Sequence, residues 1–333
     1  MIAIVLVNWN GWQDTIECLE SIYLSKYKKF QVFVVDNGST DSSLEYISAW
    51  ANGELCVWCP PNSVMRQYSH PPIAKKLLYI VYNLKDNETV TTRNENKILK
   101  TQCDGSTYPL ILIKSETNLG FGEGNNIVLR YIKSMTNFKY IWLLNNDTVI
   151  TSQSLSQMVD VAQSHSGITG SILKFYFEPN MIQAYGGGYF SEFSGRVVTE
   201  TKSKASKLNL IIGASFMMDK KLLDTVGFFD QNIFMYFEET DYCIRAKKMN
   251  YSCLCSDAIV FHKVGCSTSF NSYFSWYNIY KNKFYSLKKN YGFGLWFFIF
   301  VGSLVLNSVR PFVNINKKRA SRDVLFEKII WSK

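Results

Sequence analysis

The chain has 333 residues, of which 47% are hydrophobic, and a formal net charge of +9. A chain of this length and apolar content can bury a sizeable core, in one large α/β domain or in two smaller ones, which excludes a disordered or fibrous protein. Eight unevenly spaced cysteines do not form a disulfide framework, so we interpret them as reduced thiols.

The first third of the sequence alternates short apolar runs with helical patterns. An apolar run at 2–7 follows Met1 directly; it is too short for a signal peptide and is typical of a buried strand. A helix is predicted over about 12–24, a strand over 32–35 and a second helix over 44–50. This alternation predicts βαβ units in a parallel sheet, and the lack of an export signal at the amino terminus predicts a cytoplasmic protein.

The alternation stops between residues 51 and 108, where Pro, Asn and Thr are frequent and apolar runs such as 77–81 are brief. We interpret this segment as an insertion into the core sheet. It either covers a binding pocket, contacts a partner or forms a decorated surface loop. Beyond it the pattern predicts strands at 110–113, 140–144, 168–173 and 210–218 and helices at 125–134 and 155–164.

Residues 291–309 are apolar on every face, but they fall short of the roughly twenty apolar residues that a membrane span needs. Basic residues flank this stretch on both sides: Lys281, Lys283, Lys288, Lys289, Arg310, Lys317, Lys318, Arg319 and Arg322. Basic and aromatic residues around an apolar helix are typical of one that lies in or dips into the membrane face. We therefore predict peripheral membrane contact, with a buried core helix as the alternative.

Polar residues follow four of the predicted strands, at 8–11, 36–41, 118–126 and 145–147. Open α/β sheets bind ligands at the carboxyl ends of their strands, so these residues are the first candidates for a site. The carboxylate of Asp36 could accept hydrogen bonds from a base or a ribose, or it could belong to a capped turn. The glycine-rich turn at 118–126 could bring backbone amides at a helix start close to a phosphate.

The polar residues Asn145, Asn146 and Asp147 come directly after the predicted strand at 140–144. Alternate side chains of a short turn direct Asn145 and Asp147 to the same side, and oxygen ligands of this kind suit Mg²⁺ or Mn²⁺. Three polar residues after a strand also form an ordinary turn. His262 ends another predicted strand and is either a metal ligand or a structural histidine.

An acidic segment opens a predicted helix that extends to Met249. Glu238, Glu239 and Asp241 lie within four positions, among aromatic side chains. Acidic residues in a first turn are a common response to the helix dipole. The functional alternative is that one of these carboxylates has a raised pKa and acts as a general base.

Seven short motifs occur in order along residues 2–267. They are VLVNWNG at 5–11, VVDNGSTDSS at 34–43, NLGFGEGNN at 118–126, LLNNDT at 143–148, IIGASFMM at 211–218, VGFFDQNIFMYFEETDYCIRAKKMNY at 226–251 and FHKVGCS at 261–267. Together they resemble family 2 glycosyltransferases of the GT-A fold, especially the rhamnosyltransferase-like branch of bacterial surface-polysaccharide synthesis. The resemblance implies an α/β GT-A catalytic domain over 1–267, with a mostly parallel central sheet flanked by helices, and a C-terminal helical membrane-associating region over 268–333.

The resemblance implies a donor site for a nucleotide-diphosphate sugar. Asp36, with Asn8 nearby, would bind the base and ribose, and the glycine-rich turn would shape the pocket. The implied donor-binding residues are Asn8, Asp36, Asn118, Gly120, Asn125, Asn145 and Asn146. In the family an Asp-x-Asp motif holds a metal through the donor diphosphate; here Asn145 departs from that motif and Asp147 keeps to it. His262 matches a family histidine, so the implied Mg²⁺ or Mn²⁺ ligands are Asp147, His262 and Asn145.

The resemblance also implies the catalytic base. In the family's pattern the second acidic residue is the base, which makes Glu239 the first choice and Asp241 the reserve. Gly213, Ala214 and Glu238 are the implied contacts of the acceptor. The implied reaction is a single inverting displacement by a hydroxyl of a glycan or lipid-linked glycan, at the cytoplasmic face of the membrane.

Two other functions fit parts of the sequence. A membrane-associated inactive transferase or binding module is favoured by Asn145 in place of an aspartate, and it is opposed by the retained carboxylates and His262. A nucleotidyltransferase would need a basic phosphate-binding loop near the first strand, and residues 8–11 carry no charge. Nucleic acid is not a predicted partner, because no stacking platform is interleaved with the basic residues.

Overall fold

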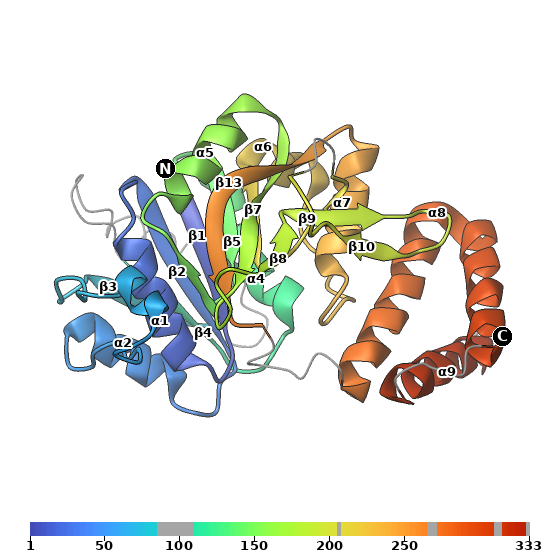
Figure 1. The fold of residues 1–333 in the computed structure, drawn as a ribbon, viewed down its shortest axis with the longest axis horizontal. Helices are drawn as coiled ribbons and strands as arrows, with labels where there is room; N and C mark the ends of the chain where they lie inside the picture. Colours follow the sequence, from blue (N-terminus) through green and yellow to red (C-terminus); the bar gives the residue numbers. More distant parts are fainter. Residues whose placement is uncertain (85–109, 205–207, 265–271, 310–314, 331–333) are drawn as a thin grey trace.

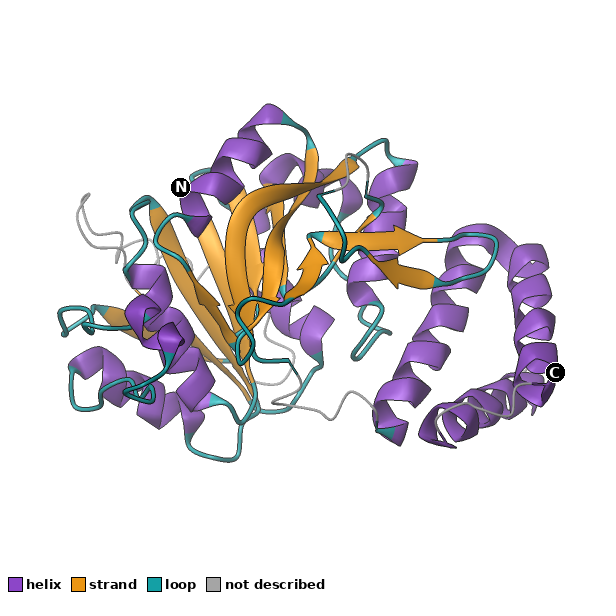
Figure 2. Ribbon diagram, in the orientation of Figure 1, coloured by secondary structure: helices purple, strands orange, loops and turns teal. Residues whose placement is uncertain are grey.

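The structure is a computed structural model that describes residues 1–84, 110–204, 208–264, 272–309 and 315–330. Within these residues a ten-stranded sheet forms the centre of the molecule, and a three-stranded sheet lies beside it. Helices cover both faces of the central sheet (Figure 2). Helices α8 (Tyr273–Val309) and α9 (Ile315–Ile330) lie at the end of the molecule opposite strand β3 (Tyr79–Asn83), as Figure 1 shows. The α/β class that the alternation predicts is confirmed.

The first half of the central sheet is parallel and has the strand order β3-β4-β2-β1-β5. Its elements are β1 (Ile2–Asn8), α1 (Trp12–Tyr23), β2 (Phe30–Asn37), α2 (Ser43–Asn52), β4 (Leu110–Ser115), α4 (Phe121–Ser134) and β5 (Tyr140–Leu144). The predicted insertion at 51–108 supplies the edge strand β3, which pairs with β4, and a short 3-10 helix over Val64–Tyr68. Part of that segment is therefore continuous with the core sheet, and residues 85–109 lie outside the described residues.

The second half of the central sheet is mixed. β12 (Ser215–Asp219) lies antiparallel between β5 and β7 (Gly167–Phe175), so the central sheet is mostly parallel, as the resemblance implies. β13 (Ser252–His262) is parallel to β7, while β6 (Thr148–Ile150) pairs with β13 and β8 (Ile182–Tyr185) with β7, both antiparallel. The remaining elements are α5 (Ser154–Ser164), β9 (Gly187–Phe190), β10 (Val197–Thr199), β11 (Leu210–Ile211), α6 (Lys220–Val226) and α7 (Glu238–Lys248).

The prediction of a single strand over 210–218 is wrong, because the segment forms two strands. The chain leaves β11, which belongs to the three-stranded sheet, turns at 212–214 and enters β12 in the central sheet. A continuous apolar run does not reveal such a break, because both strands are buried and need apolar residues for different neighbours. The turn between them becomes important for the site described below.

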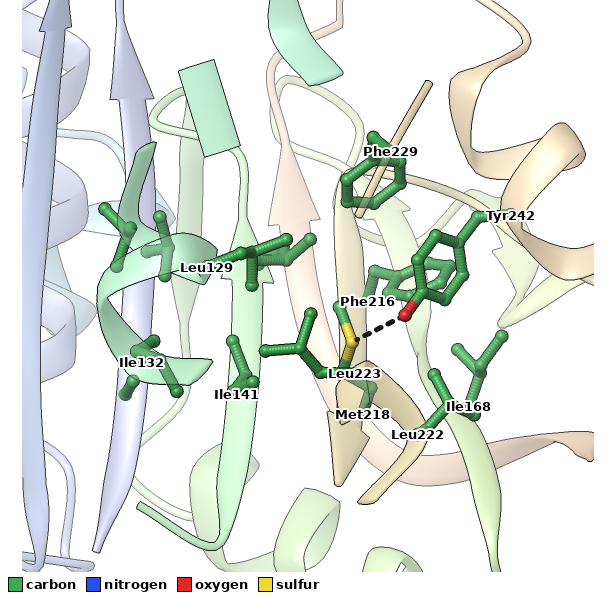
Figure 3. Close-up of a cluster of buried hydrophobic side chains, with 14 of the residues drawn as sticks. Leu129, Ile132, Ile141, Ile168, Phe216, Met218, Leu222, Leu223, Phe229 and Tyr242 are labelled. Carbon is green, nitrogen blue, oxygen red and sulfur yellow. Dashed lines mark hydrogen bonds between the residues drawn. The ribbon is translucent and has the colours of Figure 1, made fainter. Parts of the chain in front are cut away.

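Both faces of the central sheet are buried, and the alternation along β1 shows how. Ile2, Ile4 and Leu6 pack against α1, α2 and α5, whereas Ala3 and Val5 point to the opposite face, which α4, α6 and α7 cover. Figure 3 shows part of this second layer, in which the hydroxyl of Tyr242 donates to the sulfur of Met218 at 3.4 Å. Burial on both faces leaves only the edges and strand ends of the sheet for function. The cysteines of the described residues are free thiols: Cys18, Cys56, Cys59, Cys243, Cys253 and Cys255.

The C-terminal helices form a small apolar cluster of their own. α8 bends at Gly292, where φ is 81°, a value that favours glycine, so the apolar segment predicted at 291–309 is the second arm of a bent helix. One face of this arm, including Trp296 and Phe300, packs against Phe284 and against α9. Among the described residues, no helix combines the length and apolarity needed to cross a membrane. The predicted domain boundary at 267/268 lies outside the described residues.

Candidate active site

One edge of the central sheet collects most of the residues predicted to form a site. Strands β1, β2, β5, β7 and β13 run in the same direction, so Asn8, Asp36 and His262 end their strands at this edge, and residues 145–147 follow β5 there. β12 runs the opposite way, and its first residue Ser215 pairs with Leu144. The turn at 212–214 therefore also lies at this edge.

Asn8 and Asp36 are neighbours in the β1–β2 register, and their side chains bond to each other. The Asn8 amide donates to the Asp36 carboxylate at 3.0 Å and contacts the Ser39 hydroxyl at 3.1 Å, which also accepts from the Asn10 backbone at 3.0 Å. Asp36 is buried, and this burial raises its pKa, while the Ser39 and Asn8 hydrogen bonds oppose the rise. The pair predicted to bind a base and ribose is thus already aligned.

A further buried residue, Thr15, extends this network and was not found by sequence reasoning. Its hydroxyl donates to the Asn8 side-chain oxygen at 2.8 Å, and the Asn146 amide donates to the Thr15 hydroxyl at 3.0 Å. Asn146 therefore points toward α1, away from the side of the turn that Asn145 and Asp147 share. Thr15 shares the buried side of α1 with other polar residues such as Glu17 and Glu20, so no sequence signal singled it out.

The glycine-rich turn at 118–126 is held by side chains at both of its ends. Asn37 accepts from the Leu119 backbone at 3.1 Å and donates to the Asn118 side chain at 3.0 Å. Gly120 has φ of 83°, and a β-carbon there would lie 2.0 Å from the Phe234 carbonyl oxygen. Only glycine fits this close approach.

The helix that follows this turn begins earlier than predicted, at Phe121 instead of 125. The Phe121 backbone donates to the Phe234 carbonyl at 3.0 Å, so the start of α4 is fastened to the loop before α7. Asn125 donates to the Phe121 carbonyl at 2.9 Å, within its own helix. The Asn126 side chain makes two hydrogen bonds with the backbone of Phe229. Its amide nitrogen donates to the Phe229 carbonyl at 3.0 Å, and its oxygen accepts from the Phe229 N–H at 2.9 Å.

Asn145 and Asp147 lie on the same side of the turn, as its alternation predicts, and His262 at the end of β13 lies against both of them. The His262 Nε2 atom lies 3.4 Å from the Asn145 amide nitrogen and 3.3 Å from the Asp147 Oδ1 atom. The side chains of Asp147 and His262 are largely buried, with 9% and 10% of their surface exposed. Burial alone would raise the pKa of Asp147, but the contact with His262 outweighs it and lowers that pKa.

The far nitrogen of His262 has a partner that sequence reasoning did not find. His262 Nδ1 lies 3.1 Å from the side-chain oxygen of Gln183 in β8. An amide oxygen only accepts, so the contact with Gln183 places a proton on Nδ1, while Nε2 is directed at Asn145 and Asp147. No motif marks Gln183, because the pairing of β8 with β7 that brings it here depends on the fold.

The convergence of these three side chains fits a divalent cation. The Oδ1 atoms of Asn145 and Asp147 are buried, and neither has a hydrogen-bond partner within the described residues. Two oxygens without a hydrogen-bond partner and the Nε2 atom of an imidazole form a donor set that Mg²⁺ or Mn²⁺ accepts. Among the described residues no three His, Cys, Asp or Glu side chains form a ready-made metal cluster, so remaining positions would fall to substrate oxygens and water.

The acidic segment begins α7 and lies beside the 212–214 turn. A β-carbon on Gly213 would lie 3.9 Å from the β-carbon of Glu239, and the Ala214 carbonyl accepts from the Asn145 backbone at 3.0 Å. This turn thus connects the acidic helix to the cation-binding residues.

Burial changes the acidity of the two glutamates. It raises the pKa of Glu239 to about 7, within reach of neutral pH. Burial, together with the charge of Glu239, also raises the pKa of Glu238, whose Oε2 atom has no hydrogen-bond partner in the described part of the chain. Tyr236 and Phe237 reach this helix start with φ of 65° and 79°, a strained conformation that the surrounding contacts must hold.

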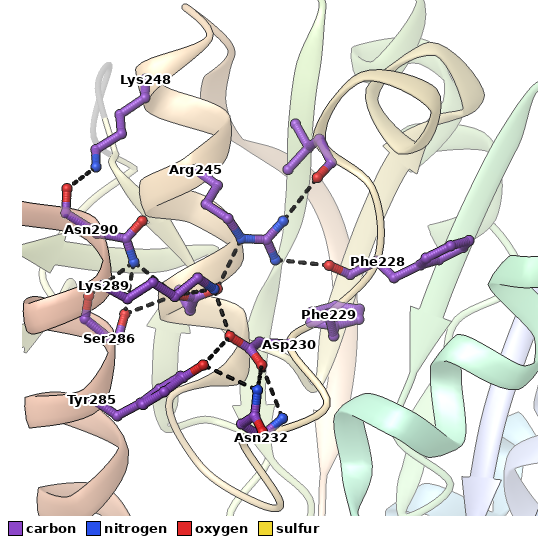
Figure 4. A network of polar contacts seen from close by, with 12 residues as sticks. Phe228, Phe229, Asp230, Asn232, Arg245, Lys248, Tyr285, Ser286, Lys289 and Asn290 are labelled. Carbon is purple, nitrogen blue, oxygen red and sulfur yellow. Dashed lines mark hydrogen bonds and ion pairs between the residues drawn. The ribbon is translucent and has the colours of Figure 1, made fainter.

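Asp241 is fully buried and joins α7 to α8. Figure 4 shows the residues that donate to it, Arg245 of α7 and Ser286, Lys289 and Asn290 of α8. The Asp241 carboxylate accepts from Arg245 at 2.9 Å, from Ser286 at 2.9 Å and from Asn290 at 2.8 Å, and it pairs with Lys289 at 3.2 Å. Both oxygens are occupied by donors. The arrangement therefore favours Glu239 over Asp241 as a base.

Comparison with known proteins gives one family match and one curated relative. The chain matches the family described as "Glycosyl transferase family 2" over residues 3–67 and 84–227. It is 27% identical over 179 residues to the "Low-salt glycan biosynthesis hexosyltransferase Agl10" of Haloferax volcanii. The match covers 52% of this chain and 58% of that relative's length.

Two solved structures resemble the fold at low sequence identity. The mannosyltransferase PcManGT from Pyrobaculum calidifontis, in complex with GDP-Man and Mn²⁺, superimposes with a TM-score of 0.52 at 14% identity, covering 100% of this chain and 76% of that one. GalNAc-T7 with UDP, GalNAc and Mn²⁺ gives 0.56 at 11% identity, covering 99% and 56%. These likenesses confirm the GT-A fold that the sequence motifs imply.

Proposed function

The chain belongs to glycosyl transferase family 2, and we propose that it transfers a sugar from a nucleotide-diphosphate donor to a hydroxyl of a glycan or lipid-linked glycan. One observation carries the proposal. The 212–214 turn lies between Glu239, a carboxyl group with a raised pKa, and the convergent oxygens and nitrogen of Asn145, Asp147 and His262. A base on one side of a substrate position and a cation site on the other is the arrangement that glycosyl transfer from a diphosphate needs.

The donor would lie along the edge from Asp36 to Asp147. Asp36 and Asn8 would bind the base and ribose, because their mutual hydrogen bond holds both side chains at the ends of adjacent strands. Asn146 would support this arrangement through Thr15. The turn around Asn118 and Gly120 would form a wall of the pocket, and Asn125 would stiffen the helix behind it.

The cation would be held by Asp147, His262 and Asn145. When bound there, Mg²⁺ or Mn²⁺ would offset the negative charge that develops on the departing nucleotide diphosphate. Gln183 would keep His262 in the tautomer that presents Nε2 to the site. The two solved relatives described above were both obtained with Mn²⁺, which agrees with this reading.

Glu239 would act as the general base of a single inverting displacement. Its carboxylate would take the proton of the acceptor hydroxyl while that oxygen forms a bond to the anomeric carbon. The bond from this carbon to the diphosphate oxygen would break in the same step. Gly213, Ala214 and Glu238 would contact the acceptor sugar, since the turn and the start of α7 face each other there. Asp241 would position α7 and take no proton.

The acceptor would be a lipid-linked glycan in cell-surface polysaccharide synthesis, at the cytoplasmic face of a membrane. Two observations support this proposal: the name of the relative Agl10 refers to glycan biosynthesis, and the C-terminal helices of this chain are basic and apolar. The transferred sugar would be a hexose or rhamnose.

A donor panel tests the proposed reaction. Purified protein is incubated with UDP-, dTDP- and GDP-sugars, with and without Mn²⁺, and the released nucleoside diphosphate is measured. We expect release from one nucleotide class, dependent on Mn²⁺. Equal, negligible release from every donor, with a lipid-linked acceptor extract present, would favour the binding-module alternative that Asn145 suggests.

A further inference from the structure

The second arm of α8 carries apolar side chains on two opposite faces. On the inner face Trp296, Ile299 and Phe300 are only 4–6% exposed and pack against the first arm and α9. The outer face exposes large apolar side chains to solvent: Phe293 at 61%, Phe297 at 51%, Phe298 at 71%, Val301 at 39% and Val305 at 57%. Within the described residues, nothing covers this outer face.

The exposed side chains form one continuous stripe. Phe293, Phe297, Val301 and Val305 follow one another at intervals of four residues, so each lies about one turn beyond the last, on a stripe that winds gradually around a helix of about 3.6 residues per turn. Phe293 stacks on Phe297 with ring centroids 5.8 Å apart, and Phe298 borders the stripe. A surface helix normally turns a polar face to water, so a contiguous apolar stripe indicates an interaction site.

The excess of positive over negative charge lies in the same region of the chain. Residues 268–333 contain eleven Lys and Arg against two Asp and Glu, which accounts for the whole formal net charge of +9. Residues 1–267 contain twenty-five of each and are neutral. Exposed basic side chains lie on the first arm of α8 and on α9: Lys281, Lys288, Lys289, Lys318, Arg319 and Arg322.

A stripe of aromatic and aliphatic side chains among basic residues matches the interface of an anionic bilayer. Aromatic rings partition into the boundary between headgroups and acyl chains, and each Lys or Arg near an anionic surface adds favourable electrostatic energy. A second copy of the chain is a poor occupant, because two surfaces of the same strong positive charge repel each other.

We propose that the outer face of α8, formed by Phe293, Phe297, Phe298, Val301 and Val305, docks into the interfacial layer of a bilayer rich in anionic lipids. The surrounding Lys and Arg side chains contact the lipid phosphates. This inference deepens the proposed function and rests on it in one respect, since a lipid-linked acceptor would reach the protein from the same surface.

The docked arm is connected to the proposed base through the first arm. Ser286, Lys289 and Asn290 of the first arm all bond Asp241 of α7, two residues from Glu239. Asn282 of the same arm donates to the carbonyls of Met235 and Tyr236, just before α7 begins. Docking would therefore set the orientation of the acceptor-binding side of the protein relative to the lipid surface.

Vesicle co-sedimentation tests the docking face with the full-length protein. Vesicles of phosphatidylcholine alone are compared with vesicles that contain 40% phosphatidylglycerol (about the anionic content at which the electrostatic term is large). The wild type should bind the anionic vesicles. The double variant Phe297→Ser, Phe298→Ser should lose about tenfold or more in partitioning, because two interfacial rings are removed. Phe177→Ser, which changes a phenylalanine that is 74% exposed and lies outside α8, is the matched control and should bind like the wild type.

A second variant tests the charge separately. Lys281→Gln with Lys288→Gln removes two exposed cations that lie outside the ion pairs of Asp230 and Asp241, and binding should weaken and become less sensitive to salt. The vesicle-free donor assay of each variant should equal that of the wild type, which also shows that the variants fold. Equal binding to neutral and anionic vesicles, or unchanged binding of the Phe297, Phe298 variant, would overturn the inference.

Two further outcomes separate this inference from the proposed function. A wild type that releases nucleotide diphosphate but stays in the supernatant at every lipid composition would overturn the docking face and leave the transferase proposal standing. A wild type that is a dimer in size-exclusion chromatography and becomes a monomer on Phe297→Ser, Phe298→Ser would show that a second copy covers the face, which would also overturn the inference.

Discussion

Asp241 of α7 and Lys289 of α8 form an ion pair at 3.2 Å that joins the helix of the proposed base to the C-terminal helices. Lys289 also pairs with Asp230 at 2.6 Å. Burial would raise the pKa of Asp230, but Lys289, together with hydrogen bonds from Asn232 and Tyr285, lowers it to about 2. The C-terminal region is therefore connected to the candidate active site through ion pairs with the buried carboxylates of Asp230 and Asp241. Two different roles for Asp241, anchor and base, can be separated by mutation.

Asp241→Asn should destabilise the protein more than it slows the reaction. The change removes the anion that Arg245 and Lys289 share, and breaking a buried ion pair costs about 3 kcal/mol in the free energy of unfolding. Turnover at a temperature where the variant is folded should stay within about tenfold of the wild type, because a base contributes about a hundredfold or more. Chemical denaturation and steady-state turnover give the two numbers. A stable variant without turnover would make Asp241 the base.

The pH dependence of the reaction should report the raised pKa of Glu239. A general base works in its ionised form, so kcat/KM should rise with pH through about 7 and level off above it. A buffer series from pH 5 to pH 9, a range of about two units on either side of that pKa, measures the profile. A profile that is flat from pH 5 upward would contradict the assignment.

The same raised pKa predicts a stability trend of defined sign. The folded protein holds the Glu239 proton more tightly than the unfolded chain does. In the unfolded chain the pKa of this carboxyl group has its ordinary value of 4.5. The contribution of this group to stability is therefore greatest below pH 4.5 and falls as the pH rises to about 7. In Glu239→Gln that part of the dependence should vanish when unfolding is measured across the same pH range, while the part due to Glu238 remains.

Mn²⁺ affinity should depend on the ligand Asp147 and on Gln183, the hydrogen-bond partner of the ligand His262. Asp147→Ala should remove most of the affinity measured by calorimetry with a nucleoside diphosphate present, because it deletes the one anionic ligand. Gln183→Leu should weaken Mn²⁺ binding by about tenfold or more, since His262 loses the acceptor that fixes its tautomer. Gln153→Leu changes an exposed glutamine before α5 and should leave the affinity unchanged. Wild-type affinity in Asp147→Ala would exclude this cation site.

Nucleotide binding should depend on the Asn8–Asp36 pair. Asp36→Ala should weaken binding of the donor's nucleoside diphosphate by about tenfold or more, because a buried, aligned acceptor for ribose or base is removed. Asp160→Ala, at an exposed position on α5, is the matched control. Equal affinity of the two variants in calorimetry would move the nucleotide away from the β1 and β2 strand ends.

The parts of the fold that the sequence predicts are those with local signals. Strand β1, helix α1 and strand β2 follow from periodicity, and Asn8 and Asp36 follow from the rule that polar residues after strands collect at one edge. Gln183, Thr15 and Asn37 were missed because each acts through a partner far along the chain. The same reason explains Asp241, whose role as an anchor depends on α8, about 45 residues later.

The apolar segment at 291–309 shows a different limit of sequence reasoning. Its composition is equally compatible with a core helix and a membrane helix, and the structure gives it both kinds of face. Trp296 and Phe300 belong to a core, whereas Phe293 and Phe298 are exposed. Which residues lie on which face is fixed by the packing of α9, which no pattern within the segment reveals.

Glu239→Gln tests the central proposal most directly. The amide keeps the size of the side chain and cannot take a proton, so nucleotide-diphosphate release with acceptor should fall by about a hundredfold or more. Donor affinity and Mn²⁺ affinity, measured by calorimetry on the same preparation, should equal those of the wild type. Turnover at the wild-type rate in this variant would contradict the account, because no proton acceptor would then be needed at the start of α7.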